Sequence, residues 1–158
     1  MNTRYMEIVG VEDGTLILDP SSTNSTNSTT TTTTSSSRYT KSKAMKEKGN
    51  LLLVKMKRTF EALRVYTEAI DCLTEGGTKN QPEDSNSRQL LIDLYSNCAL
   101  ALLREKDAES AIVLCDQAIE LSSTLSYKAM YRKGQALKLL GRTAESKTWL
   151  KRARALKP

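Results

Sequence analysis

A pattern of side-chain sizes that occurs three times limits the fold of this chain more than any other feature. Each copy has a small residue, a larger residue four positions later and a small residue three positions after that, at Ala62, Tyr66, Ala69, at Ala111, Cys115, Ala118 and at Ser146, Leu150, Ala153. Residues spaced by three or four lie on one face of a helix. Gly49, Ala99 and Gly134 precede the copies, at a position where a bulky side chain would hold a partner helix away. The pattern therefore predicts three antiparallel helix pairs, which stack because one pair cannot bury its apolar face alone.

Turn-forming residues set the expected ends of these helices. Asp107 is a good N-cap residue, and Gly141 opens a turn between the last two helices. Ala111 follows Ala62 by 49 positions, whereas Ser146 follows Ala111 by only 35, so the first connection holds extra residues. A surface loop that includes 76–82 accounts for them. The expected helices cover about 41–54, 59–73, 88–104, 107–121, 127–140 and 144–156, which gives repeats at about 41–74, 88–122 and 126–158.

The N-terminal quarter of the chain differs in composition from the rest. Residues 1–20 contain two short β-branched and aliphatic runs around Glu12-Asp13-Gly14, which favours either a hairpin or a disordered tail. Residues 21–40 are dominated by Ser and Thr, which bury too little apolar surface to offset the entropy of ordering. We therefore expect a short N-terminal segment, a disordered linker over 21–40 and a helical domain over 41–158.

At this point the sequence resembles the tetratricopeptide repeat family. Gly134, Gly141, Ala153 and Pro158 fall on the glycine, alanine and proline positions of that repeat, and each second helix carries the small-to-large step. The resemblance covers roughly Lys41–Pro158. It implies an all-α domain of three tetratricopeptide-like helix pairs stacked as a right-handed superhelix, whose concave face is lined by the first helix of each pair.

Composition argues against catalysis and against metal or cofactor binding. The chain has no His, which removes the commonest general base and zinc ligand, and it has no glycine-rich phosphate-binding loop. Cys72, Cys98 and Cys115 show no metal-ligand spacing and read as small buried thiols of a reducing compartment. No apolar run is long enough to span a bilayer. We expect a non-enzymatic protein of the cytoplasm or nucleus, with no cofactor.

Polar residues at helical spacing on the first helices point to a binding groove. Lys46 and Asn50 are four residues apart, as are Lys128 and Arg132, and Asn97 lies on the middle first helix. Three cations and two amides that face one groove suit a ligand with two carboxylates, because charge-assisted hydrogen bonds are stronger than neutral ones. A C-terminal acidic residue supplies both carboxylates.

These five positions, which we name the clamp residues, resemble the two-carboxylate clamp of co-chaperone tetratricopeptide domains. The resemblance implies a protein–protein interaction module that binds the C-terminal Glu-Glu-Val-Asp peptide of the seventy- and ninety-kilodalton heat-shock chaperones. Leu53 and Leu100 continue the same faces, and Arg104 lies seven residues beyond Asn97, so these three could contact ligand residues upstream of the terminus. The alternative for them is core or solvated surface.

Two other functions stay open from the sequence. A generic assembly scaffold would bind an internal peptide in the same groove. A basic cluster on the last helix could instead bind RNA or another polyanion, although Trp149 is the only aromatic residue there to stack on bases. The cluster comprises Lys147, Lys151, Arg152, Arg154 and Lys157.

The C-terminal helix pair has no later helix to cover it in this sequence. Leu137, Leu140 and Trp149 would then form an exposed apolar patch. The sequence therefore predicts marginal stability or self-association through this uncapped pair.

Overall fold

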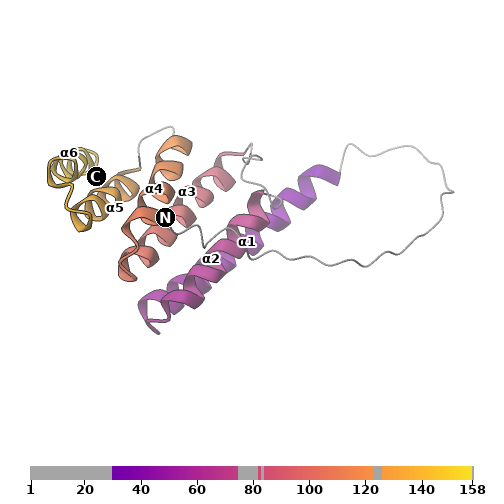
Figure 1. The fold of residues 1–158 in the computed structure, drawn as a ribbon. Coiled ribbons are helices and arrows are strands. Elements are labelled where there is room, and N and C mark those ends of the chain that lie inside the picture. Colours follow the sequence, from indigo (N-terminus) through magenta and orange to yellow (C-terminus); the bar gives the residue numbers. More distant parts are fainter. Residues whose placement is uncertain (1–29, 75–81, 83, 123–125, 158) are drawn as a thin grey trace, which may run out of the picture.

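The computed structural model describes residues 30–74, 82, 84–122 and 126–157. Within these residues the elements are helices, paired in chain order (Figure 1). They are α1 (Thr30–Val54), α2 (Thr59–Thr74), α3 (Ser85–Arg104), α4 (Ala108–Leu121), α5 (Tyr127–Leu139) and α6 (Thr143–Ala155). Each helix packs on the next, so the predicted all-α arrangement of three packed pairs is confirmed.

Within the first pair and within the third pair, the two helices approach each other closely at the predicted glycines. A Cβ atom on Gly49 would lie 2.4 Å from Cε1 of Tyr66, and one on Gly134 would lie 2.7 Å from Cγ of Leu150. Both distances are shorter than carbon atoms tolerate. Tyr66 and Leu150 are the large residues of the repeated pattern, so the pattern does mark the place where paired helices touch.

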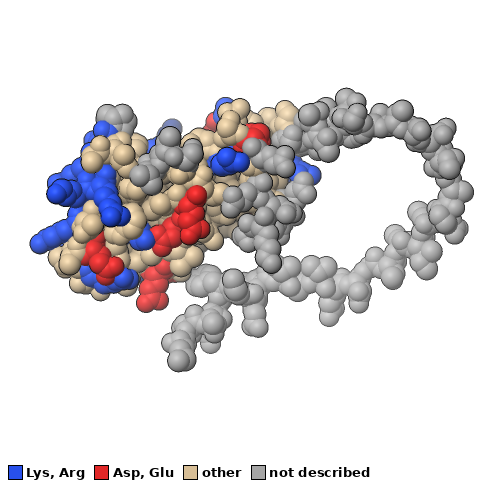
Figure 2. Space-filling view, turned by 90° about the horizontal axis from the view of Figure 1, so that it is seen from above, with Lys and Arg blue, Asp and Glu red and all other residues tan. Residues whose placement is uncertain are grey.

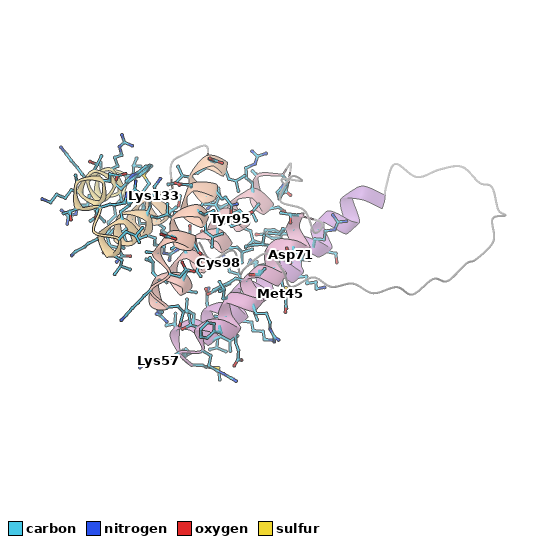
Figure 3. The ribbon with its side chains drawn as sticks, in the orientation of Figure 1. Met45, Lys57, Asp71, Tyr95, Cys98 and Lys133 are labelled. Carbon is cyan, nitrogen blue, oxygen red and sulfur yellow. The ribbon has the colours of Figure 1, made fainter. Side chains whose placement is uncertain are left out.

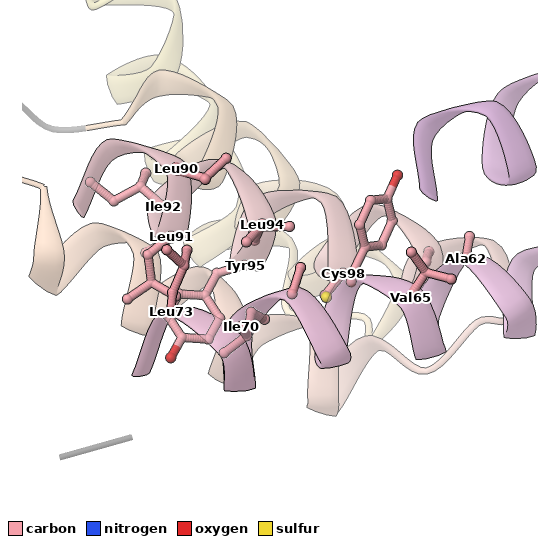
Figure 4. Packing of buried hydrophobic residues seen from close by; sticks show 14 of the residues in the cluster. Ala62, Val65, Ile70, Leu73, Leu90, Leu91, Ile92, Leu94, Tyr95 and Cys98 are labelled. Atoms are coloured by element: carbon pink, nitrogen blue, oxygen red, sulfur yellow. The ribbon is translucent and has the colours of Figure 1, made fainter. Parts of the chain in front are cut away.

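The largest part of the core lies between α2 and α3. Leu91, Leu94 and Cys98 on α3 face the buried side of α2 (Figure 4). Tyr66 has no exposed surface, and it joins the same cluster from α2. A second cluster continues into α4 and α5 through small side chains, at Ala99, Ala111, Cys115 and Ala136 with Leu102 and Ala108. The core therefore changes from large to small side chains along the stack.

The cysteines are free thiols and their burial differs. Cys98 and Cys115 are buried, and burial raises the pKa of each thiol to about 12. Cys72 is half-buried near the end of α2, where its Sγ lies 4.0 Å from the carbonyl oxygen of Arg38. The prediction of buried thiols is confirmed for Cys98 and Cys115.

The turn inside each pair contains one residue with left-handed backbone. These residues are Lys57 (φ 54°), Lys106 (φ 62°) and Gly141 (φ 76°). In each turn, the residue that follows the left-handed one donates its backbone N–H to a leucine carbonyl near the end of the first helix. These pairs are Arg58 to Leu52, Asp107 to Leu102 and Arg142 to Leu137. Asp107 caps α4 as predicted, since its Oδ1 accepts the N–H of Ser110 at 3.1 Å. The second and third turns have the same length and the same hydrogen-bond spacing although only the third carries the expected glycine, and the first turn is one residue longer.

The first helix begins well before its predicted start near Lys41. It starts at Thr30, so residues 30–40 are helical rather than part of a linker. Tyr39 packs against the core, and Ser42 has no exposed surface. Contacts with the end of α2 thus stabilise a turn whose own composition disfavours helix. The hairpin predicted within 1–20, the linker over 21–29 and loop residues 76–81 lie outside the described residues.

The third pair covers more of its apolar surface than the sequence suggested. Leu137 is 1% exposed, so its assignment to an exposed patch is wrong. The Trp149 ring is half-buried, with Nζ of Lys133 4.2 Å and the guanidinium of Arg152 5.2 Å from its centroid. Leu140 is exposed as predicted, and Leu139 and Leu156 are also exposed. Self-association through this surface stays a prediction.

Candidate functional site

The first helices of the three pairs lie side by side. Helix α3 contacts α1 on one side and α5 on the other. Lys46 and Asn50 lie on α1, Asn97 lies on α3, and Lys128 and Arg132 lie on α5. The fold therefore brings the helices that carry the clamp residues together, as the sequence predicts.

The two amides of the clamp residues are joined directly. Oδ1 of Asn50 accepts a hydrogen bond from the Tyr66 hydroxyl at 2.7 Å and another from Nδ2 of Asn97 at 2.9 Å. Burial raises the pKa of Tyr66 to about 12, so the phenol keeps its proton and donates. With the oxygen of Asn50 engaged twice, its amide NH₂ is the group left to donate to a ligand. Asn97 keeps a second N–H donor in the same way.

Lys46 is held by a carboxylate that the sequence analysis missed. Its Nζ lies 3.3 Å from Oδ2 of Asp93, and both side chains are partly exposed, at 22% and 31%. Asp93 precedes Asn97 by four residues and therefore lies on the same face of α3. That spacing is the signal that could have identified it.

Arg132 is the most buried cation of the site. Among the described residues its Nη1 atom is buried and has no hydrogen-bond partner. Burial lowers the pKa of the guanidinium, while Cys115, Tyr66 and Asp93 act in the opposite direction. A buried N–H that lacks an acceptor is costly, and a carboxylate would satisfy it with a charge-assisted hydrogen bond.

Lys128 lies one helical turn before Arg132 and is exposed. Within the described ranges, no hydrogen bond or ion pair joins it to the other clamp residues. Its position four residues before Arg132 places it on the same face of α5. Lys128 thus stands at the edge of a site whose other four side chains lie deeper.

The three accessory residues do not share one environment. Leu53 is 1% exposed and belongs to the core, which is the alternative that the sequence left open for it. Leu100 is half-buried and packs against the same core. Arg104 donates from Nη1 to the backbone carbonyl of Leu53, which ties the end of α3 to the end of α1.

The basic cluster on α6 lies at one end of the stack. Its side chains are exposed, and Figure 2 shows Lys and Arg gathered at the end where Figure 1 places α5 and α6. Lys133 on α5, labelled in Figure 3, pairs with Asp116 of α4, and its Nζ lies over the ring of Trp149. The ring that would stack on a base is therefore already in contact with two cations.

The described part of the chain offers neither a metal-binding cluster nor a membrane-spanning helix. There, no group of three or more acidic, Cys or His side chains is arranged to hold a metal ion. None of the described helices has the length and apolar character needed to cross a membrane.

Known proteins share parts of this sequence and this fold. Residues 127–158 match the family model described as "Tetratricopeptide repeat". Sperm-associated antigen 1A of Danio rerio is 36% identical over 98 residues, which are 62% of this chain and 21% of that protein. The chain thus spans about a fifth of the length of this relative.

Two solved structures have the same fold. The C-terminal tetratricopeptide domain of an FK506-binding protein of Plasmodium falciparum matches with a TM-score of 0.66 and 24% identity, covering 77% of this chain and 80% of that one. The second tetratricopeptide domain of Spaghetti (RPAP3), solved with the HSP90 peptide SRMEEVD, matches with a TM-score of 0.64 and 24% identity, covering 80% and 95%. The helices of this chain therefore have the fold of these two tetratricopeptide domains, and residues 127–158 match the repeat in sequence.

Proposed function

We propose that this domain is a co-chaperone module that binds the acidic C-terminal Glu-Glu-Val-Asp peptide of heat-shock chaperones. The observation that carries the proposal is the buried, unpartnered Nη1 of Arg132 within the described residues, on the helix beside the Asn50–Asn97 pair. The RPAP3 domain, which shares this fold, was solved with a peptide of that kind. The ligand could come from the seventy- or the ninety-kilodalton chaperone class.

The clamp residues divide the work of binding a terminal Asp, which has two carboxylates. Asn50 and Asn97 donate amide hydrogens to the ligand, and they are oriented because the Oδ1 of Asn50 accepts from the Tyr66 hydroxyl and from Nδ2 of Asn97. Arg132 offers a guanidinium whose buried Nη1 has no partner among the described residues and can take a carboxylate oxygen. Lys46 and Lys128 add charge at the more exposed sides.

The affinity should be moderate. Charge-assisted hydrogen bonds contribute about 1.5–3 kcal/mol each, but ordering a flexible peptide and immobilising Lys128 consume much of that gain. We therefore expect a dissociation constant of roughly micromolar size. Binding should weaken with salt, because Lys46 and Lys128 are reached by solvent.

Isothermal titration calorimetry with the peptide Ser-Arg-Met-Glu-Glu-Val-Asp tests the proposal. The matched control is the same peptide with a C-terminal amide, which removes one carboxylate and keeps the rest. The amidated peptide should bind at least about tenfold more weakly, a difference of about 1.4 kcal/mol. Equal affinities would contradict the clamp and favour a scaffold that binds internal peptides in the groove.

The exposed basic cluster on α6 supports polyanion binding as a second function. Its five cations face solvent, as a polyanion site requires. Trp149 argues against base stacking, because Lys133 and Arg152 lie over its ring. Binding of single-stranded RNA that Lys151→Ala and Arg154→Ala abolish would establish this function; the peptide proposal predicts that these variants keep full peptide affinity.

A further inference from the structure

Asp93 puts a negative charge inside a site built for anions. Its carboxylate lies 3.3 Å from Nζ of Lys46, across the gap between α3 and α1. The two residues are 47 positions apart in sequence, so this ion pair joins neighbouring helix pairs. Asp93 is therefore already bonded to a cation that the proposed ligand would use.

The field of Asp93 also reaches α5. Its negative charge raises the pKa of Arg132, against the larger effect of burial. Asp93 thus interacts with a cation on each side of α3, Lys46 on α1 and Arg132 on α5. A carboxylate that pairs with one clamp cation and acts electrostatically on a second has the charge that a ligand carboxylate would bring to the site.

We infer that Asp93 is an internal competitor of the acidic ligand and sets the affinity of the site. This inference rests on the proposed function. The charges of Lys46, Lys128 and Arg132 are partly offset by Asp93, so the site presents a net charge of about two to a ligand with two carboxylates. The incoming peptide must share Lys46 with Asp93 or displace it, and it is repelled by the Asp93 carboxylate in either case.

Removal of the Asp93 charge should strengthen binding. In Asp93→Asn, the side chain keeps nearly the same size, while Lys46 is released to the ligand. The peptide Ser-Arg-Met-Glu-Glu-Val-Asp should then bind about three- to fivefold more tightly, the size expected for a partly exposed ion pair. The affinity of this variant should also fall more steeply with salt, since its site carries more positive charge.

Asp116→Asn is the matched control. Asp116 also pairs with a lysine, Lys133, and its side chain is 42% exposed against 31% for Asp93. It is not among the groups that shift the pKa of Arg132. The same loss of one negative charge at Asp116 should change peptide affinity less than twofold, so the pair separates local competition from total charge.

A double-mutant cycle then tests whether Asp93 acts through Lys46. Lys46→Ala should cost more affinity in the Asp93→Asn background than in the wild-type protein, because only there is Lys46 free to bind the ligand fully. Circular dichroism checks that each variant keeps its helical content, and Asp93→Ala provides a second removal of the charge.

The outcomes separate this inference from the proposed function. Tighter binding by both Asp93 variants, with the Asp116 variant unchanged, supports competition. If the wild-type protein binds the peptide and folded Asp93 variants bind it equally or more weakly, the inference is overturned while the proposed function stands. If neither the wild-type protein nor the variants bind the peptide, the proposed function fails and the inference falls with it.

Discussion

In both the first and the third helix pair, a glycine of the first helix faces a large side chain of the second, but the two side chains differ in size and burial. In the first pair, Gly49 faces the ring of Tyr66, which has no exposed surface. In the third pair, Gly134 faces Leu150, which is half-buried. The buried residues of α2 include Val65, Ile70 and Leu73 besides Tyr66, whereas those of α6 are Ser146 and Ala153.

This difference shows how one repeat divides structural and binding roles. The large side chains of the first pair stabilise the core, and the Tyr66 hydroxyl also orients Asn50 by donating to its Oδ1. In the third pair, α6 buries only the small residues Ser146 and Ala153, and the Ser146 hydroxyl donates to the Gly134 carbonyl at 2.7 Å. That half supplies Lys128 and Arg132, so the proposed site lies between a heavily packed half and a lightly packed one.

Truncating the large residue of the first and third pairs should give the largest difference in stability between them. Tyr66→Ala should lower the free energy of unfolding by about 3–5 kcal/mol, since it opens a cavity in the largest core cluster. Leu150→Ala should cost about 1–2 kcal/mol, because part of that side chain already contacts solvent. Urea denaturation measures both. Equal losses would mean that the two pairs contribute alike.

Adding a methyl group at each glycine contact overfills the interface instead of emptying it, and again compares how tightly the two pairs are packed. Gly49→Ala should cost about 1–3 kcal/mol, because the Tyr66 ring is enclosed and cannot move aside. Gly134→Ala should cost about half as much, since the partly exposed Leu150 can change its rotamer. Thermal unfolding followed by circular dichroism compares them, and a larger loss at Gly134 would contradict this ranking.

The turns should give the smallest effects. Lys57→Gly and Lys106→Gly should each stabilise the domain by about 0.5–1 kcal/mol, because glycine tolerates the left-handed backbone that lysine adopts there. Figure 3 shows Lys57 at the tip of the first turn, where the change disturbs no core contact. Gly141→Ala should destabilise by about 1 kcal/mol for the same reason. A fall in melting temperature for both lysine variants would exclude this account of the turns.

Repeated spacing explains why the pairing was predictable from sequence. Gly49 and Gly134 lie 17 and 16 positions before Tyr66 and Leu150, the residues that they contact on the next helix, and only a small residue allows this close approach. The shared groove of Asn50 and Asn97 could also be anticipated from their helices, but the hydrogen bond between them could not, since Asn50 follows Gly49 by one residue while Asn97 precedes Ala99 by two.

Features that depend on contacts between pairs were not predictable in this way. The role of Asp93 depends on its ion pair with Lys46, which lies 47 positions away in the sequence. Leu53 lies three residues after Asn50, which at about 100° per residue leaves it about 60° away around the helix, and this offset places it in the core while Asn50 stays partly exposed. The N-terminal turns of α1 are helical because Tyr39 and Ser42 pack on the rest of the domain, which their own sequence does not reveal.

Alanine substitution on the two faces of the third pair tests the central claim most directly. Arg132→Ala and Lys128→Ala, titrated with Ser-Arg-Met-Glu-Glu-Val-Asp, should each lose at least about tenfold in affinity, or about 1.4 kcal/mol. The double variant Lys151→Ala/Arg154→Ala removes two cations from the exposed side of α6 and should bind as the wild-type protein does. Helical content should be the same in all of them. If the α6 variant loses binding while the Arg132 and Lys128 variants keep it, the peptide responds to overall charge and the shaped site proposed between α1, α3 and α5 does not exist.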